Sequence, residues 1–270
     1  MPELPEVETT RRGIEPYIVG RVIKWVAIRE MRLRWLVADS LAQSITGQTF
    51  DTVKRRAKYL LLCSEQGKLM LHLGMSGSLR VLTDQVAPGK HDHVDIGFEG
   101  GTMLRYRDPR RFGSIFWLPG DESHFLLDHL GPEPLSEEFS GEYLYIVSRR
   151  RRVAIKTFIM NSRVVVGVGN IYANEALFRA RIRPDRLVMR VSRARYDKLA
   201  QAIKAVLWEA IEAGGTTLRD FVKENGSPGY FRSRLDVYGR KDLPCVNCGR
   251  PLREIRQGGR STVLCSNCQR

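Results

Sequence analysis

The sequence predicts an α+β protein whose strands and helices occupy different parts of the chain. In the first 130 residues, short apolar or alternating runs are separated by glycine- and proline-bearing segments, a pattern typical of an antiparallel β-sandwich or barrel. After Leu130 the apolar residues follow a helical period instead. Two Cys-x2-Cys pairs near the end of the chain indicate a small additional unit, a hairpin built around a metal ion.

One short helix precedes the strands. Residues Pro5 to Glu15 show a helical pattern with acidic residues in the first turn, where the positive end of the helix dipole stabilises them. The strands that we expect after this helix are Val22–Ile28, Tyr59–Cys63, Leu69–Leu73, Val94–Phe98, Met103–Tyr106 and Ile115–Leu118.

The helical part follows a linker at Gly131–Pro134. Apolar residues at helical spacing predict a helix over Tyr196–Ala213, which Gly214 and Gly215 end. The apolar positions of this helix are Leu199, Ile203, Val206, Leu207, Ala210 and Ile211.

Composition and charge indicate a folded protein that binds a polyanion. No apolar run approaches the roughly 18 residues of a membrane span, and the first dozen residues lack the apolar stretch of a secretory signal. We therefore expect a cytoplasmic protein with no membrane partner. The 44 Lys and Arg residues exceed the 30 Asp and Glu residues, which gives a net charge of +14. This surplus favours nucleic acid as the partner, with a merely soluble basic protein or an acidic lipid surface as the alternative.

Four cysteines form a predicted zinc site. The pairs Cys245/Cys248 and Cys265/Cys268 are separated by sixteen residues, a spacing found in four-cysteine zinc sites. Two disulfides are the alternative, which a cytoplasmic location disfavours. Four thiolates leave no coordination position for water, so we expect one structural Zn²⁺. The fifth cysteine, Cys63, lies in an apolar run and is expected to be a core thiol.

The hairpin between the cysteine pairs is basic. Residues 240–270 contain seven Lys or Arg residues against Asp242 and Glu254. The segment Gln257–Arg260 is predicted to be the turn, which places Arg260 at its tip. A basic hairpin held by zinc is suited to contact DNA.

The start of the chain, Met1-Pro2-Glu3, has chemistry of its own. A small second residue permits removal of Met1, which exposes a secondary amine at Pro2. With an α-amino pKa of about 8, roughly a tenth of such amines are unprotonated at neutral pH, against about one lysine in a few thousand. The iminium that this amine forms with a sugar C1′ cannot lose its charge by deprotonation at nitrogen, so it acts as an electron sink. Glu3 could supply a general acid or base; an ordinary chain start is the alternative.

Recognisable motifs run in order along the whole chain. They are PELPEVETTRRGI at the start, RRAKYLLL (55–62), HLGMSG (72–77), KHDHVD (90–95), DPRRFG (108–113), HLGPEPL (129–135), VGVGNIYANEALF (166–178), GGTTLRDF (214–221) and the terminal cysteine pairs. Together they resemble the motifs of bacterial formamidopyrimidine-DNA glycosylases. The sister family, endonuclease VIII, typically begins Pro-Glu-Gly-Pro-Glu, and Leu4 favours the formamidopyrimidine branch.

The resemblance implies a monomeric DNA repair enzyme, a bifunctional glycosylase and AP lyase. It would excise 8-oxoguanine and formamidopyrimidines from double-stranded DNA and cleave the abasic site by β,δ-elimination. It also implies three domains: a catalytic β-sandwich over residues 1–130, a helix-two-turn-helix domain with a lid loop over 131–238, and a zinc finger over 239–270.

The resemblance assigns catalytic roles to four residues. Pro2 is the nucleophile that forms the Schiff base, and Glu3 is the proton donor at the sugar. Lys58 donates a proton in β-elimination; without the resemblance it would be a surface lysine. Arg260 serves δ-elimination and contacts phosphate.

A second group of residues is expected to bind DNA. An extruded base leaves a void in the duplex, and the resemblance assigns its filling to Met75, Arg110 and Phe112. Taken alone, Met75 and Phe112 would more often be core residues.

Further DNA contacts fall outside this group. Asn170, after two glycines, is predicted at a helix N-cap that faces a phosphate. The resemblance implies DNA contacts by His91 and Arg151, although metal binding by His91 with His93 is conceivable. It also implies that Thr216–Tyr230 forms a mobile lid over the flipped base.

Two other functions fit parts of this pattern. A noncatalytic zinc-finger protein on the same scaffold would share the charge, the cysteines and the helical part, but it would not need Pro2, Glu3 and Lys58. An endonuclease VIII-like enzyme would prefer oxidised pyrimidines with the same mechanism.

Overall fold

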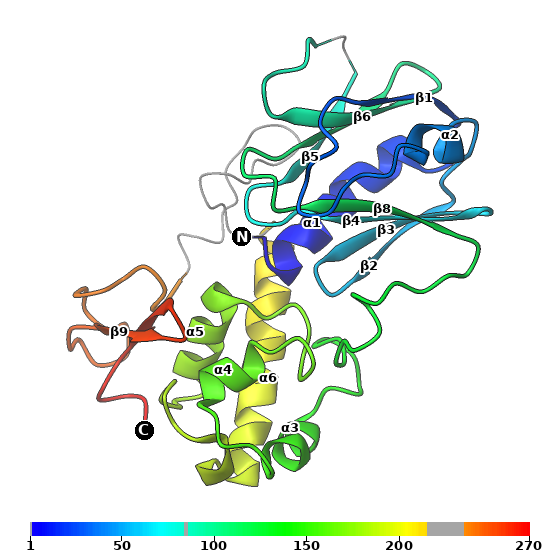
Figure 1. The fold of residues 1–270 in the computed structure, drawn as a ribbon. Coiled ribbons are helices and arrows are strands. Elements are labelled where there is room, and N and C mark those ends of the chain that lie inside the picture. The colour runs from blue at the N-terminus through cyan, green and yellow to red at the C-terminus, as the bar shows by residue number, and fades with distance from the viewer. Residues whose placement is uncertain (1, 84–85, 215–234) are drawn as a thin grey trace. The chain divides into compact units, whose positions relative to one another are not determined.

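The computed structural model describes residues 2–83, 86–214 and 235–270 (Figure 1). These residues form two compact units, one containing residues 2–128 and the other residues 129–213 with 235–270. The predicted boundary between residues 238 and 239, within the second unit, stays a prediction. The predicted lid, Thr216–Tyr230, lies outside the described residues. None of the described helices has the length and apolar composition that a membrane span needs.

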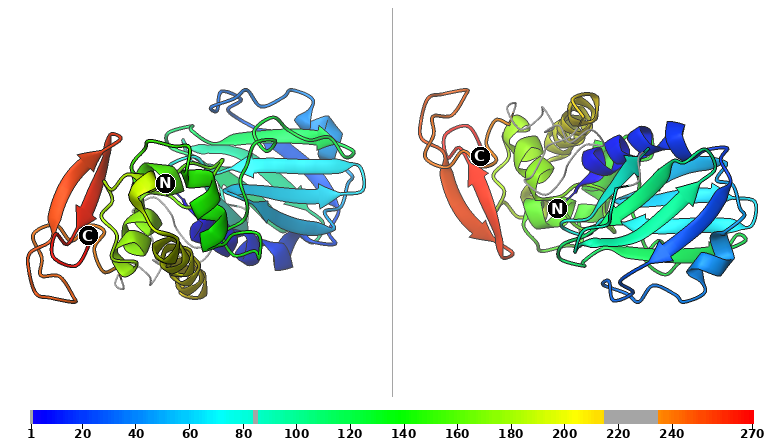
Figure 2. Two further views of the ribbon diagram at one scale, coloured as in Figure 1. Left: turned by 90° about the horizontal axis from the view of Figure 1, so that it is seen from below. Right: turned by 90° about the horizontal axis from the view of Figure 1, so that it is seen from above.

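The first unit is an antiparallel β-sandwich of two four-stranded sheets. One sheet has the order β1-β6-β7-β5 and the other the order β2-β3-β4-β8, and their inner faces share one core that includes Leu60, Leu71, Ile96 and Leu104. The strands are β1 (Ile23–Ile28), β2 (Thr52–Arg56), β3 (Tyr59–Ser64), β4 (Gly67–His72), β5 (Ser78–Leu82), β6 (Asp92–Phe98), β7 (Met103–Arg107) and β8 (Ser114–Pro119). Figure 2 shows these strands from two further directions.

Two helices cover the open sides of the sandwich. The helix α1 (Leu4–Ile18) contacts β2 and β5, which are edge strands of the two sheets, and buries Val7, Ile14 and Ile18 in the shared core. The short helix α2 (Leu41–Ile45) contacts the opposite edge strands, β1 and β8. The predicted helix at Pro5–Glu15 is therefore confirmed, with three further residues at its end.

All six predicted strands are confirmed, whereas β2 and β5 were not predicted. Strand β2 buries only Val53 of its five residues, so its sequence lacks an apolar run. Cys63, expected in the core, is half-buried in β3.

The second unit is helical and carries the cysteine hairpin. The long helix α6 (Arg193–Glu212) confirms the predicted helix, and all six of its predicted apolar positions are buried. It packs against two shorter helices, α3 (Gly141–Ser148), which was not predicted, and α5 (Asn170–Arg179), of which only the start was predicted by the N-cap at Asn170. The unit also contains α4 (Ile155–Ile159), the 3₁₀ helix η1 (Val188–Arg190), and the strands β9 (Arg253–Gln257) and β10 (Arg260–Leu264).

The hairpin β9–β10 is fastened to the helices by buried polar side chains. Lys156 of α4 donates from Nζ to the Ser261 carbonyl at 3.0 Å and to the Thr262 hydroxyl at 2.7 Å. Asn174 of α5 accepts the Val263 N–H at 2.9 Å. Since Lys156 and Asn174 are almost fully buried, these bonds fix the hairpin on the helical unit.

Candidate active site

Pro2 and Glu3 lie directly before α1, and both are buried. Glu3 is the N-cap residue, and its N–H donates to Glu6 Oε2 at 2.8 Å. The buried Glu6 carboxylate thus fixes the backbone of Glu3, the residue that follows Pro2. Glu6 was not among the predicted site residues, although a Glu three residues after an N-cap is a known capping pattern.

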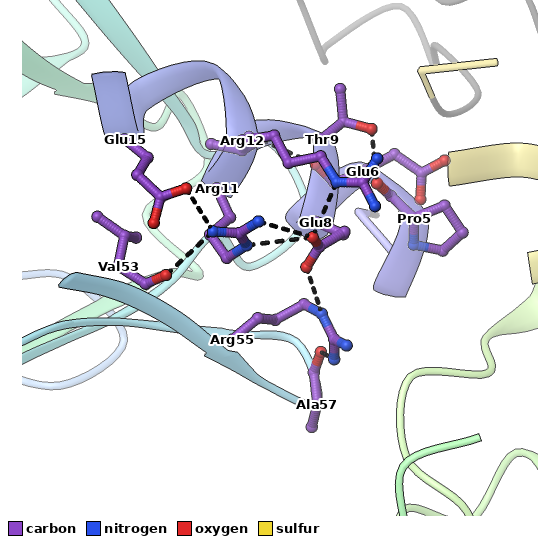
Figure 3. A network of polar contacts seen from close by, with 11 residues as sticks. Pro5, Glu6, Glu8, Thr9, Arg11, Arg12, Glu15, Val53, Arg55 and Ala57 are labelled. Atoms are coloured by element: carbon purple, nitrogen blue, oxygen red, sulfur yellow. Dashed lines mark hydrogen bonds and ion pairs between the residues drawn. The ribbon is translucent and has the colours of Figure 1, made fainter. Parts of the chain in front are cut away.

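The turn that carries Lys58 is tied to the same helix (Figure 3). Arg56 pairs with Tyr59, which makes Ala57 and Lys58 the two turn residues between β2 and β3. Arg55 Nε donates to Glu8 Oε2 of α1 at 3.1 Å, and another Arg55 nitrogen donates to the Ala57 carbonyl at 3.1 Å. Arg55 therefore connects the helix that follows Pro2 with the turn that carries Lys58.

Glu8 is ionised in this network. Burial opposes its charge, but Arg11 foremost, with Arg12 and Arg55, lowers the pKa of Glu8 overall. Arg11 also donates to Glu15 at 2.7 Å and to the Val53 carbonyl of β2 at 3.2 Å (Figure 3). The charged network holds α1 on the edge strand β2.

The strand registers bring the candidate loops to one end of the sandwich. Across β3, β4 and β8, His72 lies opposite both Tyr59 and Ser114. The Lys58 turn, the Gly74–Gly77 loop and the Asp108–Gly113 loop adjoin these three positions directly. This convergence depends on pairing between strands distant in sequence.

His72 is a site residue that the sequence analysis missed. Burial, and the positive charges of Lys58 and Arg34, lower the pKa of His72 to about 4. The imidazole is therefore neutral at pH 7. Its Nδ1 accepts the Gly74 N–H at 3.1 Å, which leaves the proton on Nε2 as a donor. The only sequence signal was its place at the start of the HLGMSG motif.

Met75, Arg110 and Phe112 line one open groove of about 650 Å³, together with His72 and residues 32–34. Met75 is 38% exposed and Phe112 is 43% exposed, so neither is a core residue. The Arg110 guanidinium lies over the Phe112 ring, 4.8 Å from its centroid. The structure thus places the three predicted void-filling side chains side by side.

His91 lies close to this groove in the turn before β6, and its carbonyl accepts the Asp108 N–H at 3.0 Å. The Nε2 atom of His93 is bonded to the Asp108 carbonyl at 2.8 Å. In the described part of the chain, only the four cysteines form a group of at least three metal-ligating side chains. The metal interpretation of His91 and His93 therefore has no structural support.

A second group of predicted residues lies in the helical unit. Asn170 is the first residue of α5, and Gly169 is the N-cap, one position earlier than predicted because Asn170 already has helical geometry. Its Nδ2 donates to the Ser261 carbonyl at 3.1 Å, while its Oδ1 is buried without a hydrogen-bond partner. Arg260, next to Ser261, is exposed at the start of β10. The structure therefore brings Asn170 to the hairpin tip.

The hairpin turn consists of Gly258 and Gly259, with φ of +55° and +74°, which glycine adopts without strain. The predicted turn over Gln257–Arg260 is confirmed. Arg151 is half-buried before α4, and its guanidinium lies 5.5 Å from the centre of the Phe158 ring.

The four cysteines fit a zinc ion. The Sγ atoms of Cys245 and Cys268 are 3.9 Å apart, those of Cys248 and Cys265 are 3.5 Å apart, and all four lie within 4.8 Å of one another. A tetrahedral Zn²⁺ with Zn–S bonds of about 2.3 Å requires S–S separations of about 3.8 Å. Burial and the neighbouring cysteines raise the pKa of Cys268 to about 12, so four thiolates need a cation to coexist.

Family models match the chain in order along its length. The formamidopyrimidine-DNA glycosylase N-terminal domain matches residues 1–115, the H2TH domain of that glycosylase matches residues 130–222, and the zinc finger found in FPG and IleRS matches residues 242–270.

Known relatives match over their whole length. The formamidopyrimidine-DNA glycosylase of Syntrophotalea carbinolica is 57% identical over 271 residues, covering 100% of both chains. The crystal structure of MutM (Fpg) from Thermus thermophilus gives a TM-score of 0.89 at 39% identity, covering 99% of this chain and 98% of that one. A Lactococcus lactis Fpg complex with Fapy-dG DNA gives 0.93 at 33% identity, covering 100% of both.

Other solved complexes of Lactococcus lactis Fpg contain DNA with an abasic site or an oxidised pyrimidine. The family models leave residues 116–129 and 223–241 unmatched, whereas the Syntrophotalea carbinolica relative aligns with the whole chain. The chain belongs to the formamidopyrimidine-DNA glycosylase family.

Proposed function

We propose that this chain excises 8-oxoguanine and formamidopyrimidines from double-stranded DNA and then cleaves the abasic site by β,δ-elimination. The observation that carries the proposal is the start of α1, where Pro2 is buried directly before the buried residues Glu3 and Glu6, and the Glu6 carboxylate accepts the Glu3 N–H. The Lys58 turn is connected to the same helix through Arg55 and Glu8. A noncatalytic DNA-binding protein would have no use for this arrangement.

In the proposed mechanism, removal of Met1 exposes the secondary amine of Pro2. The amine attacks C1′ of the damaged nucleotide, Glu3 supplies the proton at the sugar, and the base leaves. The resulting iminium acidifies the C2′ protons, so that the 3′ phosphate leaves by β-elimination with Lys58 as proton donor. A second elimination, which Arg260 promotes, releases the 5′ phosphate.

DNA binding is assigned to both units. Met75, Arg110 and Phe112 fill the void, and His91 contacts DNA. Asn170, Arg151 and Arg260 bind phosphates from the helical unit. The four cysteines would hold one Zn²⁺, which supplies structure to the Arg260 hairpin and takes no part in the chemistry. We propose that the enzyme acts as a cytoplasmic monomer.

An endonuclease VIII-like preference is the second candidate, because a Lactococcus lactis relative has been solved with an oxidised pyrimidine in its DNA. Leu4 favours the purine substrates. The two candidates share one mechanism, so only the substrate separates them.

The test is nicking of a duplex that carries 8-oxoguanine opposite cytosine, beside a duplex with an oxidised pyrimidine. We expect faster nicking of the purine duplex, with a one-nucleotide gap and phosphate at both ends. Faster nicking of the pyrimidine duplex would establish the second candidate. Binding of both duplexes without nicking would overturn the enzymatic proposal.

A further inference from the structure

A single buried carboxylate joins the two loops that carry Met75 and Phe112. Asp108 is completely buried. Its Oδ1 accepts from the Ser76 hydroxyl at 2.7 Å, and its Oδ2 accepts from the Gly113 N–H at 2.8 Å. Ser76 follows Met75 and Gly113 follows Phe112, so Asp108 is bonded next to both of these side chains.

The backbone of Arg110, the third of these groove residues, is held by the same Asp108 carboxylate and by Ser76. The Arg110 N–H donates to Ser76 Oγ at 3.1 Å and lies 3.3 Å from Asp108 Oδ1. The Tyr106 hydroxyl donates to Asp108 Oδ2 at 3.2 Å. The carboxylate therefore accepts four donors from both loops and from β7.

The Gly74–Gly77 and Asp108–Gly113 loops are in direct backbone contact, which restricts how far one can move relative to the other. Gly74 has φ of +62°, and a Cβ there would lie 2.4 Å from the Phe112 carbonyl carbon. A Cβ on Gly113 would lie 1.7 Å from the Tyr106 hydroxyl oxygen. Only glycine fits at either position.

The loop after Asp108 also contains strain. Arg111 has φ of +55°, a left-handed conformation that residues with a side chain adopt reluctantly. Such conformations persist where the surroundings determine them fully, and they gather at functional sites. Here Asp108 holds the loop on one side, and Glu30 accepts from the Arg111 guanidinium at 2.9 Å on the other.

We propose that Asp108 is a positioning residue that sets Met75, Arg110 and Phe112 in their DNA-entering arrangement before DNA binds. The inference rests on the proposed function, because it assigns to these three side chains the filling of the void left by a flipped base. Base extrusion requires unstacking and unpairing, and side chains already in place do not have to be ordered at that moment. Asp108 touches no substrate; it acts through the loops.

Asp108→Asn is the sharpest test because it keeps the volume and removes acceptors. Asparagine offers one accepting oxygen, and its NH₂ group would face either the Ser76 side or the Gly113 N–H. If the NH₂ group faces Gly113, the Gly113 N–H loses its acceptor; if it faces Ser76, the Arg110 N–H loses Asp108 as an acceptor and the Ser76 hydroxyl has to turn and accept instead of donating. Ser76→Ala is a second variant: it removes the hydroxyl that joins the Met75 loop to Asp108 and to the Arg110 N–H, and it leaves the Gly113 N–H and the Arg110 N–H beside the Asp108 carboxylate.

The measurement compares two substrates under single-turnover conditions with saturating enzyme. One duplex carries 8-oxoguanine opposite cytosine, and the other carries a preformed abasic site that has no base to extrude. We expect Asp108→Asn to slow excision of the paired lesion on the order of 10- to 100-fold, as misplaced groups do. Cleavage of the abasic duplex should change far less. Fluorescence of 2-aminopurine beside the lesion should show correspondingly slower insertion.

The matched control is Asp95→Asn. Asp95 is also fully buried and accepts from the guanidinium of Arg105 at 2.8 Å, but it lies in β6 away from both loops. Asp95→Asn should keep the wild-type ratio of lesion excision to abasic-site cleavage, even if its free energy of unfolding is lower. If Asp108→Asn does not fold, Ser76→Ala is decisive, with a smaller change of the ratio in the same direction.

The outcomes separate the inference from the proposed function. Wild-type protein that cleaves neither duplex overturns the proposed function. Active wild-type protein, together with a variant whose two rates fall equally or do not fall, overturns the positioning role of Asp108 alone.

Discussion

The chemistry at Pro2 depends on whether its nitrogen is an amine or an amide. Protein that keeps Met1, or carries additional residues before Pro2, has an amide there and no nucleophile. We predict that borohydride traps a covalent adduct on 8-oxoguanine DNA only with protein lacking Met1, and that peptide mapping places the DNA on residue 2.

The comparison needs a nucleophile-independent control. The Met1-containing protein should still bind the same DNA, because the added residue changes the nucleophile and not the residues proposed to contact DNA. Trapping at wild-type level with Met1 in place would refute the Pro2 mechanism and direct attention to Lys58. Pro2→Gly is a weaker test because it leaves a primary amine.

His72 gives a pH dependence of stability with a defined direction. Its folded pKa of about 4 lies below the ordinary value of 6.5, because of burial and the charges of Lys58 and Arg34 with Asp108 in partial opposition. Between pH 6.5 and 4 the unfolded chain therefore binds a proton that the folded protein does not. Stability should fall with acidification by at most about 1.4 kcal/mol per pH unit from this group.

His72→Gln removes the titrating group, so the free energy of unfolding should fall less steeply than in wild type over this range. Urea unfolding at pH 7, 6 and 5 measures both slopes. At pH 7 the imidazole is neutral in the folded wild-type protein. The difference in the free energy of unfolding between the two proteins at this pH therefore measures the effect of the substitution apart from titration. Parallel slopes would show that His72 is not responsible.

The sequence predicts site residues whose chemistry follows from residue type or from a family motif. Pro2 is a candidate by its position and chemistry, and Lys58 is a candidate through the resemblance alone. Asp108 and His72 are different, because their roles come from partners that only strand pairing supplies: Ser76 is 32 positions from Asp108. A one-dimensional pattern contains no signal for such partners.

Among the elements, the cysteine hairpin offers the clearest test. Cys248→Ser should lose the zinc ion and loosen the hairpin, which moves Arg260 and weakens DNA binding. Metal content and the dissociation constant for lesion DNA are the measurements. Cys63→Ser, outside the cluster, is the control and should keep both values. A metal-free Cys248→Ser protein with normal binding and cleavage would show that the metal is dispensable.

Among the helices, the two long ones, α1 and α6, were predicted over their range and the five-residue ones were not. Helix α6 spans 20 residues and repeats its apolar positions over several turns. Helices α2 and α4 have five residues each, which is too short for a period to emerge. Strand β2 buries only Val53 of its five residues, and Arg55, one of its three basic residues, is ion-paired with Glu8 of α1. In these elements, tertiary contacts determine the structure more than local pattern does.

At the scale of the whole molecule, the net charge of +14 should make DNA affinity strongly dependent on salt. Each phosphate contact adds about 0.9 to the slope of log affinity against log salt concentration. Arg260→Gln should therefore reduce the slope by about one. Arg193→Gln is a suitable control, because Arg193 of α6 is ion-paired with Glu142 of α3 at 2.7 Å. Equal slopes for wild type and Arg260→Gln would remove Arg260 from the DNA interface.

The placement of α1 and α2 has a consequence for the behaviour of this protein at high concentration. Exposed edge strands template intermolecular β-pairing, and here each of the four edge strands of the sandwich borders one of these two helices. Ile45 of α2 is fully buried, so Ile45→Asp should detach α2 and uncover β1 and β8. We predict concentration-dependent aggregation with thioflavin T binding in this variant, while its zinc content stays near one per chain. We therefore expect α1 and α2 to limit self-association by covering the sheet edges, whereas only α1 adjoins Pro2 and Glu3.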